Sequence, residues 1–283
     1  MKNKESVIRF ILMMIAFSSV SALALITFFI FMEGLPIIFK TGVLNFIGGL
    51  KWAPTRGGFG ILPMIIGSFE VTIGAMLFGF PLALLCAIYL AEFASPMAHN
   101  FLKPAIELLA GIPSVVYGFI GMTVIVPVIR KVFGGSGFSV LGCSMVLGIM
   151  ILPTITSISF DAIKAIPKKY REGSLALGAT KWQTVKMVVL PAARTGIVAA
   201  VILGMGRAIG ETMAVIMIAG NSIIIPVSPF DPVRTLTSNI ALEMGYATGA
   251  HREALFATGV ILFFIIMILN TVAGKIAARG FAK

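Results

Sequence analysis

Apolar residues occur along this chain in six long runs, separated by segments rich in polar residues, glycine or proline. The runs are Val7–Met32, Ile66–Leu90, Leu108–Ile129, Phe138–Phe160, Gly196–Ala219 and Ala254–Gly274. A helix of about 20 apolar residues crosses the hydrocarbon layer of a bilayer, where every backbone amide must be hydrogen-bonded within the protein. The pattern therefore predicts an all-α integral membrane protein with about six transmembrane helices.

Composition supports this class, because 58% of the residues are hydrophobic, only 12% are charged, and the mean hydropathy is +1.04. The net charge of +11 follows the predicted topology. Fourteen Lys and Arg residues fall in segments 1–9, 91–107, 161–195 and 275–283, whereas seven fall in the segments on the other side. Since basic residues are enriched in cytoplasmic loops, we expect a multi-pass protein of the cell membrane with both termini inside and no nucleic-acid partner.

Two outer segments are long enough to carry structure of their own. Residues 33–65 contain a Gly57-Gly58 turn. In residues 221–253, Asp231 followed by proline is placed to cap a helix. The four-residue recurrence of Leu236, Ile240 and Met244 then predicts a short amphipathic helix at the outer face.

The inner segment 161–194 is polar but contains helix signals. Pro167 is placed to begin a first helix, and Gly178 to end it in the left-handed conformation. Thr180 and Gln183 have the spacing of a capping box for a second helix, which we expect Pro191 to end.

The first of these helices carries an apolar tip, formed by Leu175 and Leu177 beside the single charge of Glu172. Such a tip is typical of a helix that docks in a groove of a partner. On periodicity alone, an ordinary solvated loop stiffened by two helices is the favoured interpretation.

The spacing of this loop matches the EAA signature of ABC importer permeases, which is Glu, two small residues, three residues, Gly, nine residues, an apolar residue, any residue and Leu-Pro. The chain has Glu172-Gly173-Ser174, then Leu175, then Gly178, and finally Val188-Val189-Leu190-Pro191. It departs from the signature in having Gly173-Ser174 where two alanines are usual. The chain thus resembles this permease family, in which the loop is a coupling helix that docks onto an ATPase subunit. The resemblance implies that Glu172, Gly173, Ser174, Leu175, Gly178, Leu190 and Pro191 serve ATPase coupling.

Further motifs resemble the phosphate importer permeases. They are Gly111-Ile112-Pro113-Ser114-Val115-Val116-Tyr117-Gly118, the run from Gly206 to Val215 and Leu236-Thr237-Ser238-Asn239-Ile240-Ala241, while the segment from Trp52 to Pro63 is closer to the C-type than to the A-type permease. The resemblance implies a type I importer fold, with an N-terminal helix and outer loop in residues 1–60 and the permease core in residues 61–283.

The implied function is import of inorganic phosphate with a second, A-type permease, two ABC ATPase subunits and an extracytoplasmic phosphate-binding protein. The chain itself is expected to be no enzyme and to hold no cofactor, because it has no GxxxxGK[ST] motif and ATP is bound by the partner. One alternative is a permease for sulfate, molybdate or phosphonate. Two further alternatives are an ATP-independent secondary transporter or channel, and a membrane sensor of phosphate.

Three ionisable residues fall within the apolar runs, namely Glu70, Arg207 and Glu211. Arg207 and Glu211 are four apart, so in a continuous helix they share one face and can pair. Charges within membrane spans usually mark a pathway, and guanidinium matches phosphate oxygens, so both are candidate pathway residues. A purely structural ion pair is the alternative. For Glu70 we expect a carboxylate near the outer boundary that reaches the surface.

The hydroxyls of Ser114 and Tyr117 are further candidates for contact with a passing anion. Hydroxyls in membrane helices also commonly bond to backbone or to adjacent helices, and that interpretation remains open for both.

Overall fold

The computed structural model describes residues 2–279, and in that part of the chain six helical segments are long and apolar enough to cross a membrane. They are Ile8–Thr41, Leu62–Phe93, Ser114–Phe133, Val140–Lys164, Lys181–Gly210 and Gly249–Val272. The predicted class and number of spans are confirmed. Residue 1 and residues 280–283, which belong to the predicted inner terminal segments, lie outside the described residues.

The first half of the chain contains α1 (Lys2–Thr41), α2 (Val43–Gly48), β1 (Trp52–Ala53), a 3₁₀ turn (Pro54–Arg56), β2 (Gly58–Phe59), α3 (Leu62–Ile88), a π-helical turn (Tyr89–Phe93), α4 (Pro96–Gly111), α5 (Ser114–Ile120), a second π-helical turn (Gly121–Ile125) and α6 (Val126–Phe133). The second half contains α7 (Val140–Lys164), α8 (Lys168–Ala176), α9 (Lys181–Thr184), a third π-helical turn (Val185–Val189), α10 (Leu190–Gly210), α11 (Met213–Ile218), α12 (Leu236–Glu243) and α13 (Gly249–Arg279).

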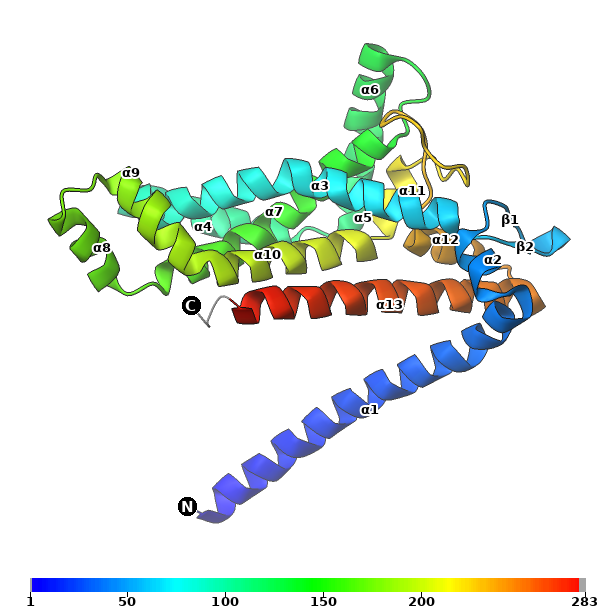
Figure 1. The fold of residues 1–283 in the computed structure, drawn as a ribbon, viewed down its shortest axis with the longest axis horizontal. Helices are drawn as coiled ribbons and strands as arrows, with labels where there is room; N and C mark the ends of the chain where they lie inside the picture. Colours follow the sequence, from blue (N-terminus) through cyan, green and yellow to red (C-terminus); the bar gives the residue numbers. More distant parts are fainter. Residues whose placement is uncertain (1, 280–283) are drawn as a thin grey trace.

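The long helices run roughly along one direction and place different short elements at their two ends (Figure 1). One end carries α8 and α9, and the opposite end carries α2, the hairpin of β1 and β2, and α12. Both chain termini point toward the α8 end. The predicted inner loop and the two predicted outer segments therefore lie at opposite ends, as the proposed topology requires.

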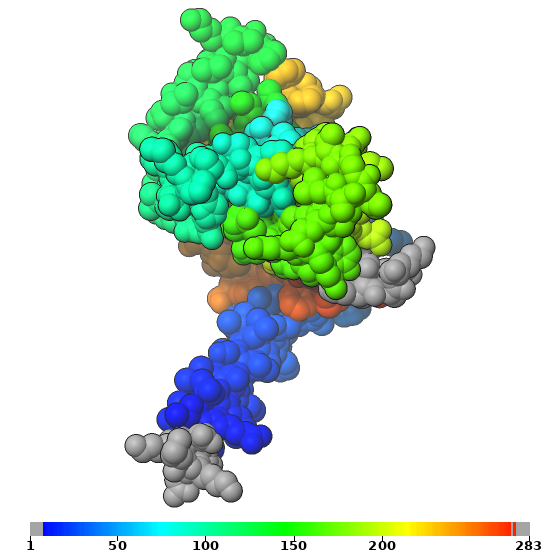
Figure 2. Space-filling model, turned by 90° about the vertical axis from the view of Figure 1, so that its left-hand side faces the viewer, coloured from blue at the N-terminus to red at the C-terminus, as the bar shows by residue number. Residues whose placement is uncertain are grey.

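Viewed from the α8 end, the yellow-green surface of α8 and α9 faces outward without cover, while α1 stands away from the body of the molecule (Figure 2). The first part of α1 has no buried residue over its most apolar window. It joins the rest over its last part, from Phe29, whose ring packs against that of Phe256 in α13, to Ile37 and Ile38, which enter a buried cluster with Phe46 and Leu255.

The pair formed by α3 and α7 is at the centre of the fold, because glycines allow the two backbones to approach closely. A Cβ atom added to Gly79 would lie 2.6 Å from the carbonyl oxygen of Gly148. Two buried hydroxyls of α7 donate across the interface, Ser144 to Val71 O at 3.5 Å and Thr156 to Ala83 O at 3.2 Å. Small residues and interhelical hydroxyl bonds are the usual means of helix association in membranes, so this pair is expected to behave as one unit.

Two predicted spans are interrupted. The predicted run Leu108–Ile129 is divided at Ile112 and Pro113, and its first residues belong to α4 instead. Proline disfavours the helical conformation of the residue before it, and Ile112 is accordingly extended, with ψ of 126°. The predicted run Gly196–Ala219 is likewise divided at Glu211, which is extended with ψ of 132°.

One predicted break does not occur. Pro191 was expected to end the second loop helix, but α9 continues through the π-helical turn Val185–Val189 into α10. Proline lacks an amide hydrogen and its ring crowds the carbonyl four residues earlier. The wider π-helical turn that precedes Pro191 accommodates this misfit without ending the helix.

The outer segments contain more structure than predicted. α1 extends nine residues beyond the predicted end at Met32, to Thr41. Gly57 has a left-handed φ of 72° and forms the hairpin turn between β1 and β2. The predicted outer helix exists as α12, but its cap is Thr235 rather than Asp231, and Leu236 is fully buried.

Candidate functional site

Arg207 lies in the last turn of α10 and is held from α7, not from its own helix. Its Nη1 donates to Thr154 Oγ1 at 3.1 Å. Because Glu211 is extended, it does not lie one helical turn after Arg207, and none of the ion pairs among residues 2–279 joins the two. The predicted Arg207–Glu211 pair is therefore wrong.

Glu211 stabilises the interruption between α10 and α11. Its Oε1 accepts a hydrogen bond from the amide of Ala214 at 3.1 Å, and its carbonyl accepts one from Thr237 Oγ1 at 2.8 Å. A free backbone group in the membrane interior costs several kcal/mol. Glu211 and Thr237 thus provide the polar partners that an interrupted membrane helix requires.

The two candidate hydroxyls lie beside the other interruption. Tyr117 is buried, and its hydroxyl donates to Leu109 O at 2.7 Å, so for this residue the structure favours the backbone-bonding alternative. Tyr117 also belongs to the same buried cluster as Ile155 and Ala208, the chain neighbours of Thr154 and Arg207. Ser114 is the first residue of α5 and is partly buried. The structure thus brings Arg207, Thr154 and Tyr117 into one region.

α10 presents an open face beside Arg207. A Cβ atom added to Gly206 or Gly210 would meet nothing within 4 Å, and Leu203 is 55% exposed. These residues share one face of the helix with Arg207 by their spacing of three, four and seven. The guanidinium is therefore anchored on one side and accessible on the other.

Glu70 lies farther from the end of its helix than predicted. α3 begins at Leu62, so Glu70 is two turns inside the helix. Its side chain is partly exposed and lines a hollow of about 390 Å³ formed with α7 and residues 226–229.

The loop with the EAA spacing forms the predicted pair of short helices. Gly178 has a left-handed φ of 85° after α8, and Thr180 and Gln183 make both hydrogen bonds of the capping box. Glu172 and Leu175 are exposed, and Leu177 is 91% exposed. An apolar tip with one charge is therefore free to contact a partner, as predicted.

The remaining residues of the signature shape the loop. Nothing lies within 4 Å of a Cβ atom added to Gly173, so this side of α8 is open. Ser174 Oγ lies 3.0 Å from Thr184 Oγ1 and joins α8 to α9. Leu190 is partly buried and packs on a buried cluster that includes Phe160 and Val189, whereas Pro191 is exposed.

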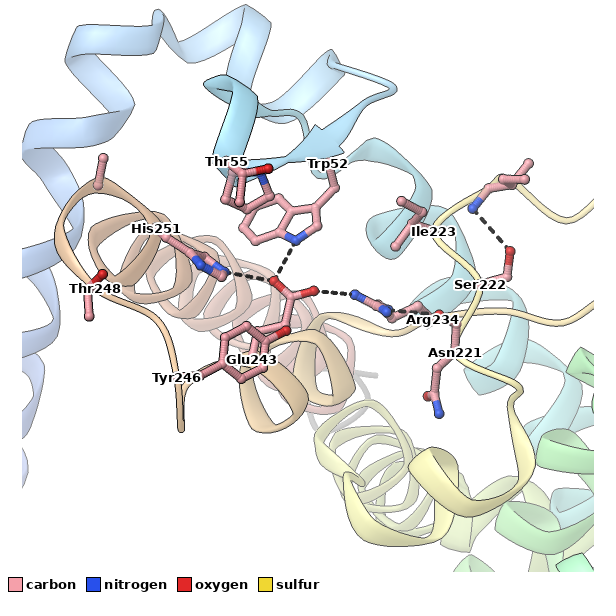
Figure 3. Close-up of a pocket in the computed structure, with 13 residues that line it drawn as sticks. Trp52, Thr55, Asn221, Ser222, Ile223, Arg234, Glu243, Tyr246, Thr248 and His251 are labelled. Atoms are coloured by element: carbon pink, nitrogen blue, oxygen red, sulfur yellow. Dashed lines mark hydrogen bonds and ion pairs between the residues drawn. The ribbon is translucent and has the colours of Figure 1, made fainter.

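The end opposite α8, which the sequence predicts to be the outer one, holds a polar cluster that no sequence pattern predicted and that is called the outer cluster below (Figure 3). Glu243 Oε2 accepts a hydrogen bond from Trp52 Nε1 and lies 2.8 Å from His251 Nε2. The other carboxylate oxygen, Oε1, accepts a hydrogen bond from Arg234 Nη1 at 2.6 Å. These residues line a pocket of about 710 Å³. No local signal could have found the cluster, because Trp52 and Glu243 are 191 residues apart.

The chain belongs to the family of binding-protein-dependent transport system inner membrane components, whose family model matches residues 79–282. It is therefore a multi-pass membrane protein of the permease class. It is 44% identical over 278 residues to the probable ABC transporter permease protein YqgH of Bacillus subtilis, which covers 94% of this chain and 90% of that relative.

Several further relatives carry a more specific name. The phosphate transport system permease protein PstC of Haemophilus influenzae is 36% identical over 250 residues, covering 80% of this chain and 79% of the relative. The PstC protein of Pasteurella multocida is 32% identical over 261 residues, covering 85% of this chain and 82% of the relative. Among solved structures, a bacterial ABC transporter for alginate import has a TM-score of 0.63 at 17% identity, covering 92% of this chain and 95% of that one. The MetNI methionine transporter, in inward-facing form, has a TM-score of 0.58 at 20% identity, covering 82% and 97%. The predicted type I importer fold is confirmed.

The outer cluster leads to a prediction about pH. Burial alone would raise the pKa of Glu243, but hydrogen bonds from Trp52, His251 and Arg234 together with the charge of Arg234 lower it below 4.5. The charged carboxylate therefore stabilises the fold above about pH 4.5, and this contribution is lost as the pH falls through the lowered pKa. Glu243→Gln should reduce the free energy of unfolding by about 1–3 kcal/mol at pH 7.

The measurement is unfolding in detergent at pH 7 and near pH 3. The difference between the parent and Glu243→Gln should shrink as the pH falls through the lowered pKa of Glu243, because the carboxyl then becomes neutral, as the glutamine amide is at every pH. Glu107→Gln is the matched control, since Glu107 is exposed and makes no hydrogen bond or ion pair within the described residues. A Glu243→Gln effect that is the same at both pH values would contradict the assignment.

Proposed function

We propose that this chain is one permease subunit of an ATP-driven importer of inorganic phosphate in the cell membrane, with both termini cytoplasmic. A second, homologous A-type permease completes the pathway. Two ABC ATPase subunits bind the α8 end and hydrolyse ATP, and an extracytoplasmic phosphate-binding protein delivers phosphate to the opposite end. The chain itself holds no cofactor. The similarity to the PstC relatives over about four fifths of both chains supports the choice of phosphate.

The observation that carries the proposal is Arg207. Arg207 lies in the last turn of α10, within a membrane span where a charge costs free energy of insertion, and no ion pair with a carboxylate among the described residues offsets that cost. One Nη donates to Thr154, and the open face of α10 leaves the guanidinium accessible to an anion. A planar guanidinium suits a phosphate oxyanion through forked hydrogen bonds, while the single Thr154 anchor leaves the anion free to depart.

The docking role of the loop follows the same reasoning. Glu172 and the two exposed leucines form the contact with the ATPase, and the open surface at Gly173 permits close approach of the partner. Ser174, Gly178, Leu190 and Pro191 fix the loop onto the start of α10.

The function is tested by reconstituting the complete complex in liposomes and measuring labelled phosphate uptake with ATP on the ATPase side. Uptake should require both ATP and the binding protein, and excess sulfate, molybdate or phosphonate should leave it unchanged. ATP-dependent uptake of labelled sulfate, molybdate or phosphonate, without uptake of phosphate, would assign the chain to that substrate instead. Phosphate uptake without ATP would identify a secondary transporter.

Variants of Arg207 test the pathway in the same liposomes. Arg207→Lys keeps the charge but loses the planar fork, so uptake should fall roughly tenfold while assembly survives. Because Arg207 and Glu211 do not pair, Glu211→Gln should not restore uptake to Arg207→Gln. Thr154→Val should weaken uptake less than either Arg207 variant does, since it removes the anchor but not the charge. Normal uptake by Arg207→Gln would remove Arg207 from the pathway.

A further inference from the structure

Arg171 lies directly before the coupling residue Glu172, but its side chain points into the protein and joins three elements. Its Nε and Nη2 donate to Glu92 Oε1 at 2.9 and 2.5 Å, where Glu92 belongs to the π-helical turn that ends the second span. Its Nη1 donates to Ile166 O at 2.6 Å, and Nη2 also donates to Ile163 O at 2.9 Å. One guanidinium thus contacts the second span, the end of α7 and the connection to α8.

Burial makes this contact energetically significant. The side chain of Arg171 is 19% exposed and that of Glu92 is 9% exposed. Surface ion pairs contribute little to stability, whereas charge-assisted hydrogen bonds away from water are stronger, and removing one partner leaves the other charge buried. The carbonyls of Ile163 and Ile166 lie in and after the last turn of α7, where the negative end of the helix dipole favours a cation.

The connection between α7 and α8 would otherwise be a hinge. Only residues 165–167 separate the two helices. Arg171 spans this connection, because it projects from α8 and binds backbone on the α7 side. Rotation of α8 about residues 165–167 therefore requires breaking its hydrogen bonds to Ile163, Ile166 and Glu92 together.

The elements joined by Arg171 continue to the membrane site. α3 and α7 pack closely through Gly79 and Gly148, and Thr154 of α7 holds Arg207. A displacement applied to α8 is thus applied to α3 and α7, and through α7 to the anchor of the guanidinium.

We propose that Arg171 is a positioning residue for energy coupling, which makes α8, α3 and α7 move as one body when the ATPase subunits close. This inference rests on the proposed function. It gives two adjacent residues different roles: Glu172 contacts the ATPase subunit, and Arg171 transmits the displacement of α8 into the protein. Without Arg171, α8 turns about residues 165–167, and ATP is hydrolysed without moving phosphate.

The test is the ratio of phosphate transported to ATP hydrolysed by the reconstituted complex. In Arg171→Ala this ratio should fall roughly tenfold, while the ATPase subunits still co-purify and hydrolyse ATP. A residue that only stabilises the fold would lower the amount of active complex and leave the ratio unchanged. Arg194→Ala is the matched control, because Arg194 is an exposed arginine near the start of α10 with no hydrogen bond or ion pair within the described residues.

A second variant addresses loss of folding in Arg171→Ala. Combining Arg171→Met with Glu92→Gln removes both charges at similar volume and leaves no unpaired charge buried, so this complex should assemble and show the same low ratio. A normal ratio in either assembled variant, or failure of both variants to assemble, would overturn the proposal. If the parent complex hydrolyses ATP but transports no phosphate, the proposed function fails and not the role of Arg171.

Discussion

The close contact between α3 and α7 is the constraint on which the rest of the molecule depends. In a bilayer, apolar side chains gain little by leaving lipid for protein, so helix association relies on close packing and interhelical hydrogen bonds. Gly79 and Gly148 allow the backbones to meet, and the hydroxyls of Ser144 and Thr156 bridge them. The end of this pair that lies toward α8 carries Glu92, and its middle carries Thr154.

In the proposed importer, this arrangement transmits a displacement of α8 to the anchor of Arg207. Beyond the short connection 165–167, the exposed α8 is joined to the pair by one partly buried guanidinium, that of Arg171. On the other side, the pair holds Arg207 where α10 is interrupted. A flexible contact at either place would let one element move without the other. The structure instead has a side-chain hydrogen bond at each, between Arg171 and Glu92 and between Arg207 and Thr154.

The sequence predicted what depends on neighbours along the chain. The six apolar runs, the left-handed Gly178 and the capping box of Thr180 and Gln183 all follow from local chemistry, and each is confirmed. The interruption at Pro113 had a local signal, but the apolar run around it concealed that signal because hydropathy does not register backbone conformation. Pro191 carried the same signal, but there the preceding π-helical turn accommodates the proline and the helix continues.

The remaining features depend on contacts that no local pattern records. Glu211 leaves the helix because Thr237 and the amide of Ala214 satisfy its polar groups, and Thr237 is 26 residues away. Without that knowledge, the four-residue spacing to Arg207 indicated a pair that does not form. The same holds for Glu92 and Arg171, which are 79 residues apart, and for the outer cluster around Glu243.

The central claim is that α8 and the α3–α7 pair form one body, and a distance between them tests it most directly. Spin labels at Lys169→Cys on α8 and Leu77→Cys on α3, both exposed positions, report this distance when Cys86 and Cys143 are replaced by alanine. Pulsed electron spin resonance on the assembled complex should give the same distance distribution without nucleotide and with a bound ATP analogue. A shift of the main distance when the analogue binds would show that α8 moves separately and would contradict the account.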